Sequence, residues 1–223
     1  MKKTAIILGA TGLTGTHLLK LLIDDNRYEK IKLFSRKKIE GLPSKVEQFI
    51  GNIIELESFR PDFNADVVFC CIGTTLKKSP DKNVYRSIDY GIPTKAAQLS
   101  KENKIETFMV ISALGANPDS TLFYNKLKGE MEEKVLSYNI KNTFILQPSY
   151  IKGDRNENRP LERIYDVLFP LVSLFLVGKL KKYKTIKATT ITDAMCNLAA
   201  LKPTIKKIES DQIKKYAITK NQN

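Results

Sequence analysis

A glycine-rich turn near the start of the chain has residue types and spacing that could do chemistry. In GATGLTG, Gly9, Gly12 and Gly15 follow an apolar run directly and open a helical pattern. The first glycine of such a turn permits a sharp bend, the second lets the backbone approach a pyrophosphate, and the third lets the helix pack closely on the strand. The N–H groups of the helix N-terminus then attract the phosphates. We therefore predict a dinucleotide site that includes Gly9, Thr11, Gly12, Leu13, Thr14 and Gly15.

The residues that follow the second apolar run indicate which dinucleotide would bind. The second strand should end near the adenosine ribose, where NAD-binding proteins carry an acidic residue that holds the 2′-hydroxyl. This chain has Arg36 and Lys37 at that point. A guanidinium group can bind a 2′-phosphate, so the sequence favours NADP over NAD. The alternative is a solvated basic turn.

A tyrosine and a lysine, Tyr124 and Lys128, are spaced so that a helix would place them on one side. The spacing alone carries no weight, because it also occurs at positions 28/32, 183/187 and 216/220. Only the 124/128 pair begins the helix after the fifth predicted strand, and Ser112 ends that strand. A nearby ammonium lowers the pKa of a tyrosine, so Tyr124 could exchange a proton with a carbonyl oxygen during hydride transfer.

Two further roles complete this predicted catalytic group. Lys128 could also hold the ribose of the nicotinamide, and Ser112 could donate a hydrogen bond to the carbonyl. The alternative is that Tyr124 and Lys128 are ordinary residues of a helix surface.

Short apolar runs alternate with helical patterns along the chain. Strands are predicted over 4–10, 30–35, 45–50, 66–73, 107–112 and 143–148, and helices over 13–25, 82–103, 120–138, 161–180 and 191–202. Uninterrupted apolar strands suit a parallel sheet that is buried on both faces. The alternation predicts an α/β fold with a doubly wound, Rossmann-type sheet.

One domain is expected for the whole chain, residues 1–223. Residues 1–150 would form the sheet, and residues 151–223 would form a small, mostly helical extension over its carboxyl edge, on the substrate side. The chain has 223 residues, which suits one large domain better than two.

Composition excludes several classes of protein. Hydrophobic residues make up 42% and charged residues 27%, which is an ordinary globular balance. Three cysteines and a single histidine, His17, indicate no disulfide framework, no metal site and no Ser–His triad. The apolar run at the N-terminus is too short for a signal peptide, and residues 167–178 are too few to span a bilayer. We therefore expect a cytoplasmic protein without a membrane span.

Positive charge is concentrated near the C-terminus. The formal net charge is +13, and residues 179–223 hold 11 lysines and three acidic residues. A basic segment can bind an anionic partner. The 30 lysines far outnumber the seven arginines, and no nucleic-acid motif is visible, so nucleic acid is not an expected partner. A solvated lysine-rich surface is the simpler interpretation.

Four segments together resemble the short-chain dehydrogenase/reductase superfamily. They are GATGLTG (9–15), FCCIGTT (69–75), ISALGANPDSTLFYNKLKGEMEEKV (111–135) and the turn at Pro148. More narrowly, they resemble its atypical branch, which contains the Tat-interacting-protein oxidoreductases and their bacterial relatives. The resemblance covers about residues 4 to 165.

The resemblance implies roles for particular residues. The glycine turn would hold the pyrophosphate, and Arg36 with Lys37 would meet the 2′-phosphate. The remaining cofactor contacts would be Asn52 and Ile53 by the adenine, Gly73, Thr74 and Thr75 beneath the ribose, and Pro148 and Ser149 beside the nicotinamide. Tyr124 and Lys128 would be catalytic.

Two departures from the family pattern concern the substrate side. Ala113 stands where many relatives have a second serine or threonine, and Gln147-Pro148-Ser149 replaces the usual Arg-Pro-Gly.

Two functions remain open from the sequence. The first is an NADP-dependent oxidoreductase acting on a small carbonyl or alcohol, with a sugar-nucleotide epimerase as a variant. The second is a non-catalytic NADP(H)-binding regulator that acts through a protein partner. The substrate, the protein partner and any homo-oligomer are left open.

Overall fold

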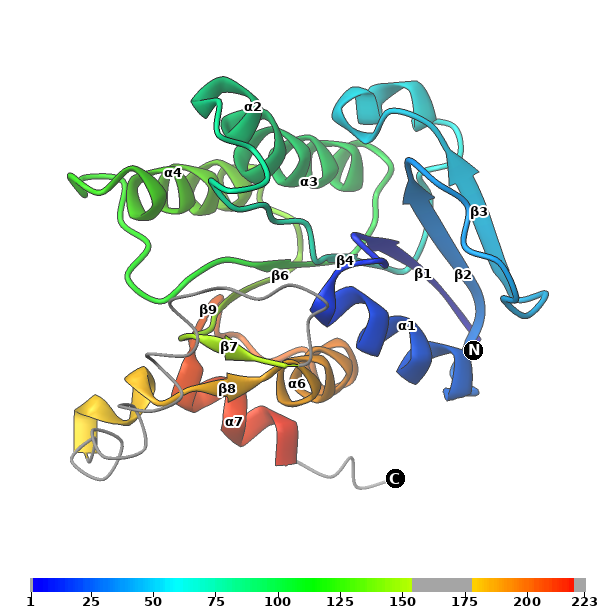
Figure 1. Ribbon diagram of the computed structural model, residues 1–223. Helices are drawn as coiled ribbons and strands as arrows, with labels where there is room; N and C mark the ends of the chain where they lie inside the picture. The colour runs from blue at the N-terminus through cyan, green and yellow to red at the C-terminus, as the bar shows by residue number, and fades with distance from the viewer. Residues whose placement is uncertain (1, 154–177, 219–223) are drawn as a thin grey trace.

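Seven parallel strands form the central sheet of the computed structural model, which describes residues 2–153 and 178–218 (Figure 1). The strand order is β3-β2-β1-β4-β5-β6-β9, and every neighbouring pair runs parallel. The strands are β1 (Lys3–Leu8), β2 (Tyr28–Ser35), β3 (Val46–Ile50), β4 (Val67–Cys70), β5 (Thr107–Ile111), β6 (Asn142–Gln147) and β9 (Lys207–Glu209). The predicted α/β fold with a doubly wound sheet is confirmed.

The inner strands β1, β4 and β5 are largely apolar because both faces of the sheet are buried there. In β1, Ala5 and Ile7 belong to the core on one face, while Ile6 and Leu8 belong to the core on the other. Successive side chains of a strand point to opposite faces, so a strand covered on both sides must be apolar throughout.

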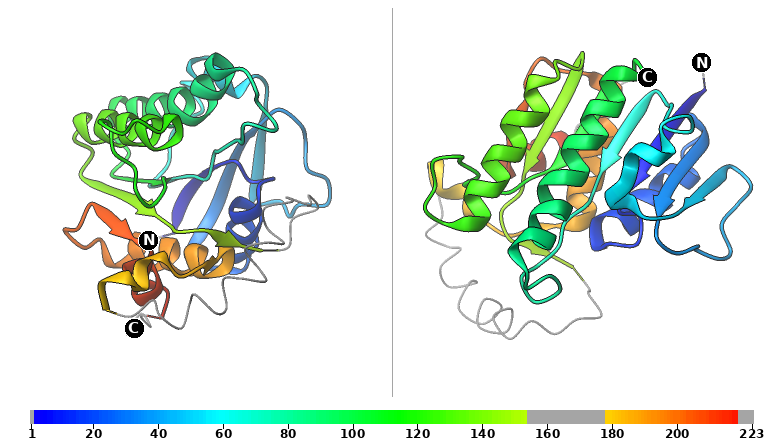
Figure 2. Two further views of the ribbon diagram at one scale, coloured as in Figure 1. Left: turned by 60° about the vertical axis from the view of Figure 1, so that its left-hand side comes forward. Right: turned by 90° about the horizontal axis from the view of Figure 1, so that it is seen from above.

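Helices cover the two faces of the sheet. On one face lie α1 (Leu13–Asp24), α6 (Ala188–Leu201) and α7 (Ser210–Ile218), and on the other lie α3 (Ile92–Glu102) and α4 (Phe123–Ser137). The view from the side shows these two helical layers with the sheet between them (Figures 1 and 2). The link from β2 to β3 contains no helix, as its length predicts, and the short helix η1 (Ile53–Phe59) follows β3.

The helix predicted over 82–103 is interrupted by a single π-helical turn. It consists of α2 (Lys82–Arg86), the π turn η2 (Ser87–Gly91) and α3 in direct succession. Single π turns inside helices occur frequently at functional sites. This turn places the side chain of Asp89, which is buried, beneath the loop that follows β4.

The C-terminal segment contributes more to the sheet than its sequence indicated. β9 is the seventh strand beside β6, and α6 packs against α1 on a sheet face rather than over the carboxyl edge. The pair β7 (Ile151–Lys152) and β8 (Ile186–Lys187) forms a second small sheet, and η3 (Gly178–Tyr183) precedes β8. Most of the helix predicted over 161–180, including Pro170, lies outside the described residues.

The strand order fixes where a ligand can bind. Strands β1 and β4 lie side by side at the centre, and the chain moves outward from them in opposite directions. The loops that leave the carboxyl ends of these two strands therefore diverge, and such a crevice is the usual ligand site of an open α/β sheet.

Candidate active site

The glycine turn has the geometry that a pyrophosphate loop requires. Gly9 has a positive φ of 84°, and a Cβ there would come within 2.8 Å of the carbonyl oxygen of Cys71. A Cβ on Gly15 would collide with the carbonyl group of Gly9, so this glycine lets α1 pack against the turn. A Cβ on Gly12 would meet only ordinary contact, at 3.4 Å from the carbonyl oxygen of Gly9.

The start of α1 is open toward the loop. Its N-cap is Gly12, which has no side chain to cap the helix. Thr11 is exposed, Leu13 is half-buried and Thr14 is buried at the first turn. The uncapped N–H groups and the helix dipole favour an anion at this position.

The residues predicted to bind the adenosine end lie at the carboxyl ends of β2 and β3. Leu8 of β1 pairs with Phe34 of β2, so Arg36 and Lys37 follow β2 next to the glycine turn, and both are exposed. Asn52 caps η1: its Oδ1 accepts a hydrogen bond from the backbone N–H of Ile54 at 3.2 Å.

The loop after β4 is held by the π turn. The backbone N–H of Thr74 donates a hydrogen bond to Oδ2 of Asp89 at 2.7 Å. The Thr74 hydroxyl lies 3.0 Å from that of Ser79. At Gly73 the nearest atom to an added Cβ is Oδ1 of Asp89 at 3.8 Å, so this part of the loop is open. Thr75 follows at the same loop and is half-buried.

Tyr124 and Lys128 lie in the first turns of α4, as predicted. The side chain of Tyr124 is 42% exposed, whereas that of Lys128 is only 3% exposed. The Nζ atom of Lys128 forms a salt bridge of 2.8 Å to Oδ1 of Asp89, which is 1% exposed. Asp89 could not be predicted from local sequence, because only the contact of η2 with α4 brings it to Lys128.

The charges around Lys128 determine its protonation. Burial disfavours the ammonium form, but the Asp89 carboxylate and the nearby Tyr124 side chain outweigh it and raise the pKa of Lys128. Lys128 therefore stays positively charged at neutral pH. Cys70 lies near this pair, but burial raises the pKa of its thiol to about 11, so it is protonated and unreactive.

Ser112 makes a different contact from the one predicted. Its hydroxyl donates a hydrogen bond of 2.5 Å to Oε1 of Glu132, a fully buried carboxylate on α4. A hydroxyl has one proton to donate, so Ser112 can polarise a carbonyl only after it releases Glu132.

The turn after β6 connects the sheet to the C-terminal segment. Pro148 is buried, and its carbonyl oxygen accepts a hydrogen bond from the N–H of Leu114 at 2.9 Å. The Ser149 hydroxyl donates to the carbonyl oxygen of Lys184 at 2.5 Å and lies 2.9 Å from that of Ser210. This places Pro148 beside the loop that follows β5 and Ser149 against the C-terminal segment.

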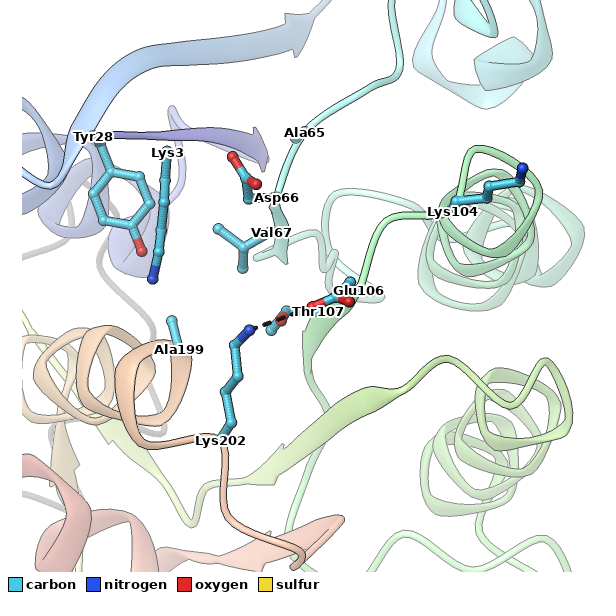
Figure 3. A pocket seen from close by; sticks show the side chains of 10 residues that line it. All are labelled: Lys3, Tyr28, Ala65, Asp66, Val67, Lys104, Glu106, Thr107, Ala199 and Lys202. Carbon is cyan, nitrogen blue, oxygen red and sulfur yellow. Dashed lines mark ion pairs between the residues drawn. The ribbon is translucent and has the colours of Figure 1, made fainter. Parts of the chain in front are cut away.

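The tyrosine of one of the other Tyr–Lys pairs, Tyr28, lies at the opposite end of the strands. Tyr28 lines a cavity of about 130 Å³ at the amino ends of the strands (Figure 3). The lining includes the first residues of four strands, which are Lys3, Tyr28, Val67 and Thr107. The glycine turn follows the last residue of β1, so the cavity is separate from the predicted dinucleotide site. In Figure 3 the ion pair of Lys202 with Glu106, 3.5 Å long, crosses one side of the cavity.

Comparisons with known proteins show which family the chain belongs to. A family model described as the semialdehyde dehydrogenase NAD-binding domain matches residues 4–89. The chain is 35% identical over 158 residues to Protein FMP52, mitochondrial, of Candida glabrata, which covers 70% of this chain and 67% of that protein. It is 34% identical over 164 residues to Protein HTATIP2 of Rattus norvegicus, covering 72% and 67%.

Solved structures show the same fold at low sequence identity. UDP-glucose 4-epimerase of Thermotoga maritima, solved with UDP-glucose, matches with a TM-score of 0.70 and 15% identity over 95% of this chain and 80% of that one. The Bordetella bronchiseptica enzyme WbmH, solved with NAD+, matches with a TM-score of 0.69 and 15% identity over 94% and 75%.

The fold and the glycine turn thus define a dinucleotide-binding protein of the Rossmann class. The chain belongs to the atypical branch of the short-chain dehydrogenase/reductase superfamily, together with the FMP52 and HTATIP2 proteins.

The expected cytoplasmic location is contradicted by these relatives. The FMP52 proteins of Candida glabrata, Scheffersomyces stipitis and Debaryomyces hansenii are named as mitochondrial. Our expectation rested on the lack of a signal peptide and of a spanning segment, and neither property distinguishes the cytoplasm from the interior of an organelle. The prediction of a cytoplasmic location is therefore wrong. Among residues 2–153 and 178–218, no helix is long and apolar enough to cross a membrane.

Proposed function

We propose that the protein is an NADP(H)-dependent oxidoreductase that transfers hydride to or from a small carbonyl or alcohol. The observation that carries this proposal is the buried Lys128 ammonium, fixed by Asp89 one helical turn from the half-exposed Tyr124. An ammonium that stays protonated at neutral pH near a phenol favours the phenolate and so lowers the cost of proton transfer.

Each of the chain's own residues at this site would then have a defined role. The glycine turn and the N-terminus of α1 bind the pyrophosphate, and Arg36 with Lys37 bind the 2′-phosphate. Bound NADPH supplies the hydride. The Tyr124 hydroxyl gives its proton to the carbonyl oxygen, and Lys128 keeps the resulting phenolate stable.

The choice of NADP over NAD rests on charge at the end of β2. Arg36 and Lys37 are exposed next to the glycine turn, and no carboxylate occupies either position. The exposed guanidinium can form two parallel hydrogen bonds with a phosphate. The NAD-binding neighbours show the fold alone, so they do not weigh against this choice.

A regulatory role is the second candidate, and the Ser112 contact favours it. With its proton donated to Glu132, Ser112 leaves the site with one fewer donor for a carbonyl oxygen. In that case bound NADP(H) would control association with a protein partner, and Tyr124 would have no role in turnover.

Binding and turnover assays on the full chain separate the two candidates. NADPH and NADH affinities are measured by calorimetry, and a panel of aldehydes, ketones and quinones is then screened for loss of NADPH absorbance. Tight NADPH binding with turnover of at least one class supports the oxidoreductase. Tight binding without any turnover supports the regulator, and no binding of either dinucleotide contradicts both.

A further inference from the structure

A buried carboxylate lies one helical turn beyond Lys128, and the proposed reaction does not use it. Glu132 on α4 has no exposed surface. It accepts the hydrogen bond from Ser112 described above and two from Nε2 of Gln147, at 2.8 Å to Oε1 and 3.0 Å to Oε2. Ser112 follows β5 and Gln147 ends β6, so this one carboxylate ties α4 to the carboxyl ends of two neighbouring strands.

The charge of Glu132 is not matched by these partners. A hydroxyl and an amide satisfy its hydrogen-bonding capacity but are neutral, and a buried carboxylate needs an opposite charge to be tolerated. Lys207 supplies this charge, since its Nζ lies 2.8 Å from Oε2 of Glu132. Among the described residues, the ion-pair partner of Glu132 is Lys207.

Lys207 comes from the C-terminal part of the chain. It is the first residue of β9 and pairs with Ile145 of β6. Its side chain is 44% exposed, so the ammonium reaches the buried carboxylate while part of the side chain remains in contact with water. A lysine in this place therefore balances a charge that the helix and the two strands leave unpaired.

We propose that Lys207 is a positioning residue for the Tyr124–Lys128 pair. Strand β9 delivers the counter-charge that fixes α4 against the ends of β5 and β6. Gln147 of β6 also contacts this carboxylate but carries no charge, so the counter-charge comes from Lys207 of β9. The pairing stands on contacts alone, whereas its effect on turnover rests on the proposed function.

The pairing is tested by thermal melting of four variants of the full chain. Lys207→Met should lower Tm by about 5 °C or more, because it leaves a buried carboxylate unpaired. Lys206→Met, at the neighbouring exposed lysine, should change Tm by about 1 °C or less. Lys207→Arg should restore Tm, and Gln147→Arg should recover at least half of the loss in the Lys207→Met background.

A double-mutant cycle isolates the charge from other effects of the substitution. In the background of Glu132→Gln there is no carboxylate to balance, so Lys207→Met should cost less than half as much as in the unmodified protein. An equal cost in both backgrounds would overturn the proposal. A Tm for Lys207→Met equal to that of Lys206→Met would overturn it too. So would a loss of Tm that is relieved neither by Lys207→Arg nor by Gln147→Arg.

The positioning effect is read from dinucleotide binding and turnover below the melting temperature. Lys207→Met should reduce kcat by about tenfold or more while the NADPH affinity changes by less than about threefold, because α4 carries the reacting groups and the glycine turn does not depend on it. Lys207→Arg should restore kcat. Unchanged kcat in folded Lys207→Met overturns the positioning role. A wild-type protein that turns over no substrate refutes the proposed function, whereas the melting cycle still decides the pairing.

Discussion

Lys128 and Asp89 form a salt bridge of 2.8 Å in which both side chains are almost completely buried. The carboxylate has a second task, because its other oxygen accepts the backbone N–H of Thr74. One side chain in the π turn therefore holds both the lysine of α4 and the loop that follows β4. In the proposed function, this carboxylate would therefore set the position of Lys128 relative to the loop after β4.

The first prediction concerns the pH dependence of stability. In the wild type the pKa of Lys128 is raised, so the pair stabilises the fold below the usual lysine pKa of about 10.4 and stops doing so as the pH rises through the raised value. Asp89→Asn removes the counter-charge, and burial then lowers the pKa of Lys128. The variant should lose about 3–5 kcal/mol near pH 7.

The loss should shrink as the pH rises toward 10, because the unpaired ammonium releases its proton. Thermal melts at several pH values measure this, with the exposed Asp24→Asn as the control. A loss of stability in Asp89→Asn that is constant over this pH range would contradict the charge pairing.

Gly12 offers a test of the pyrophosphate loop that does not disturb the fold. An added Cβ would meet the Gly9 carbonyl oxygen only at 3.4 Å, so the free energy of unfolding of Gly12→Ala should lie within about 1 kcal/mol of the wild-type value. The methyl group stands where a pyrophosphate must approach the backbone, so dinucleotide affinity should fall at least about tenfold. Gly91→Ala, where the nearest atom to a new Cβ is 3.9 Å away, is the matched control. Calorimetric titration that shows equal affinities for all three proteins would rule out this binding mode.

Arg36 should determine the choice of dinucleotide. We expect NADPH to bind at least about tenfold more tightly than NADH, which corresponds to about 1.4 kcal/mol. Arg36→Asp should abolish or invert this preference, because the carboxylate repels a 2′-phosphate and accepts a 2′-hydroxyl. Lys20→Asp, an equal change of charge on the exposed side of α1, should preserve it. Equal affinities for the two dinucleotides in the unmodified protein would show that the charge at the end of β2 is not used.

The substitution Ser112→Ala tests whether the Ser112 hydroxyl polarises the substrate or holds α4 in place. Because its hydroxyl donates to Glu132, Ser112→Ala should cost about 1.5–3 kcal/mol of stability and reduce kcat by less than about tenfold. Ser137→Ala is the control, since its hydroxyl bonds to the Lys134 carbonyl oxygen on the exposed side of the same helix. If instead kcat falls by two orders of magnitude at unchanged stability, Ser112 polarises the carbonyl as its sequence position predicted.

Local patterns were sufficient to predict the sheet and the glycine turn. Apolar runs such as that of β4 are set by burial on both faces, and the three glycines follow from short-range steric limits. β9 escaped prediction because it is three residues long and only Ile208 is fully buried in it. Its assignment depends on β6, which is distant in the sequence.

The supporting residues of the site could not be predicted from spacing. Asp89 reaches Lys128 only because η2 and α4 pack together on one face of the sheet. Glu132 stands among charged residues in KGEMEEK, a stretch typical of a solvated helix face, yet it is buried. Its carboxylate is paired with Lys207, and no rule of local sequence connects residues of α4 and β9.

The most direct test of the proposed oxidoreductase function is the rate at which Tyr124→Phe oxidises NADPH with a carbonyl substrate found in the screen. The variant loses one hydroxyl and keeps the ring, so kcat should fall by about 10²–10⁴ while NADPH affinity changes by less than about threefold. Tyr183→Phe changes a tyrosine of similar exposure, 50% against 42%, and should retain the full rate. A Tyr124→Phe protein that binds NADPH normally and turns over substrate at the wild-type rate would contradict the assignment of proton transfer to Tyr124.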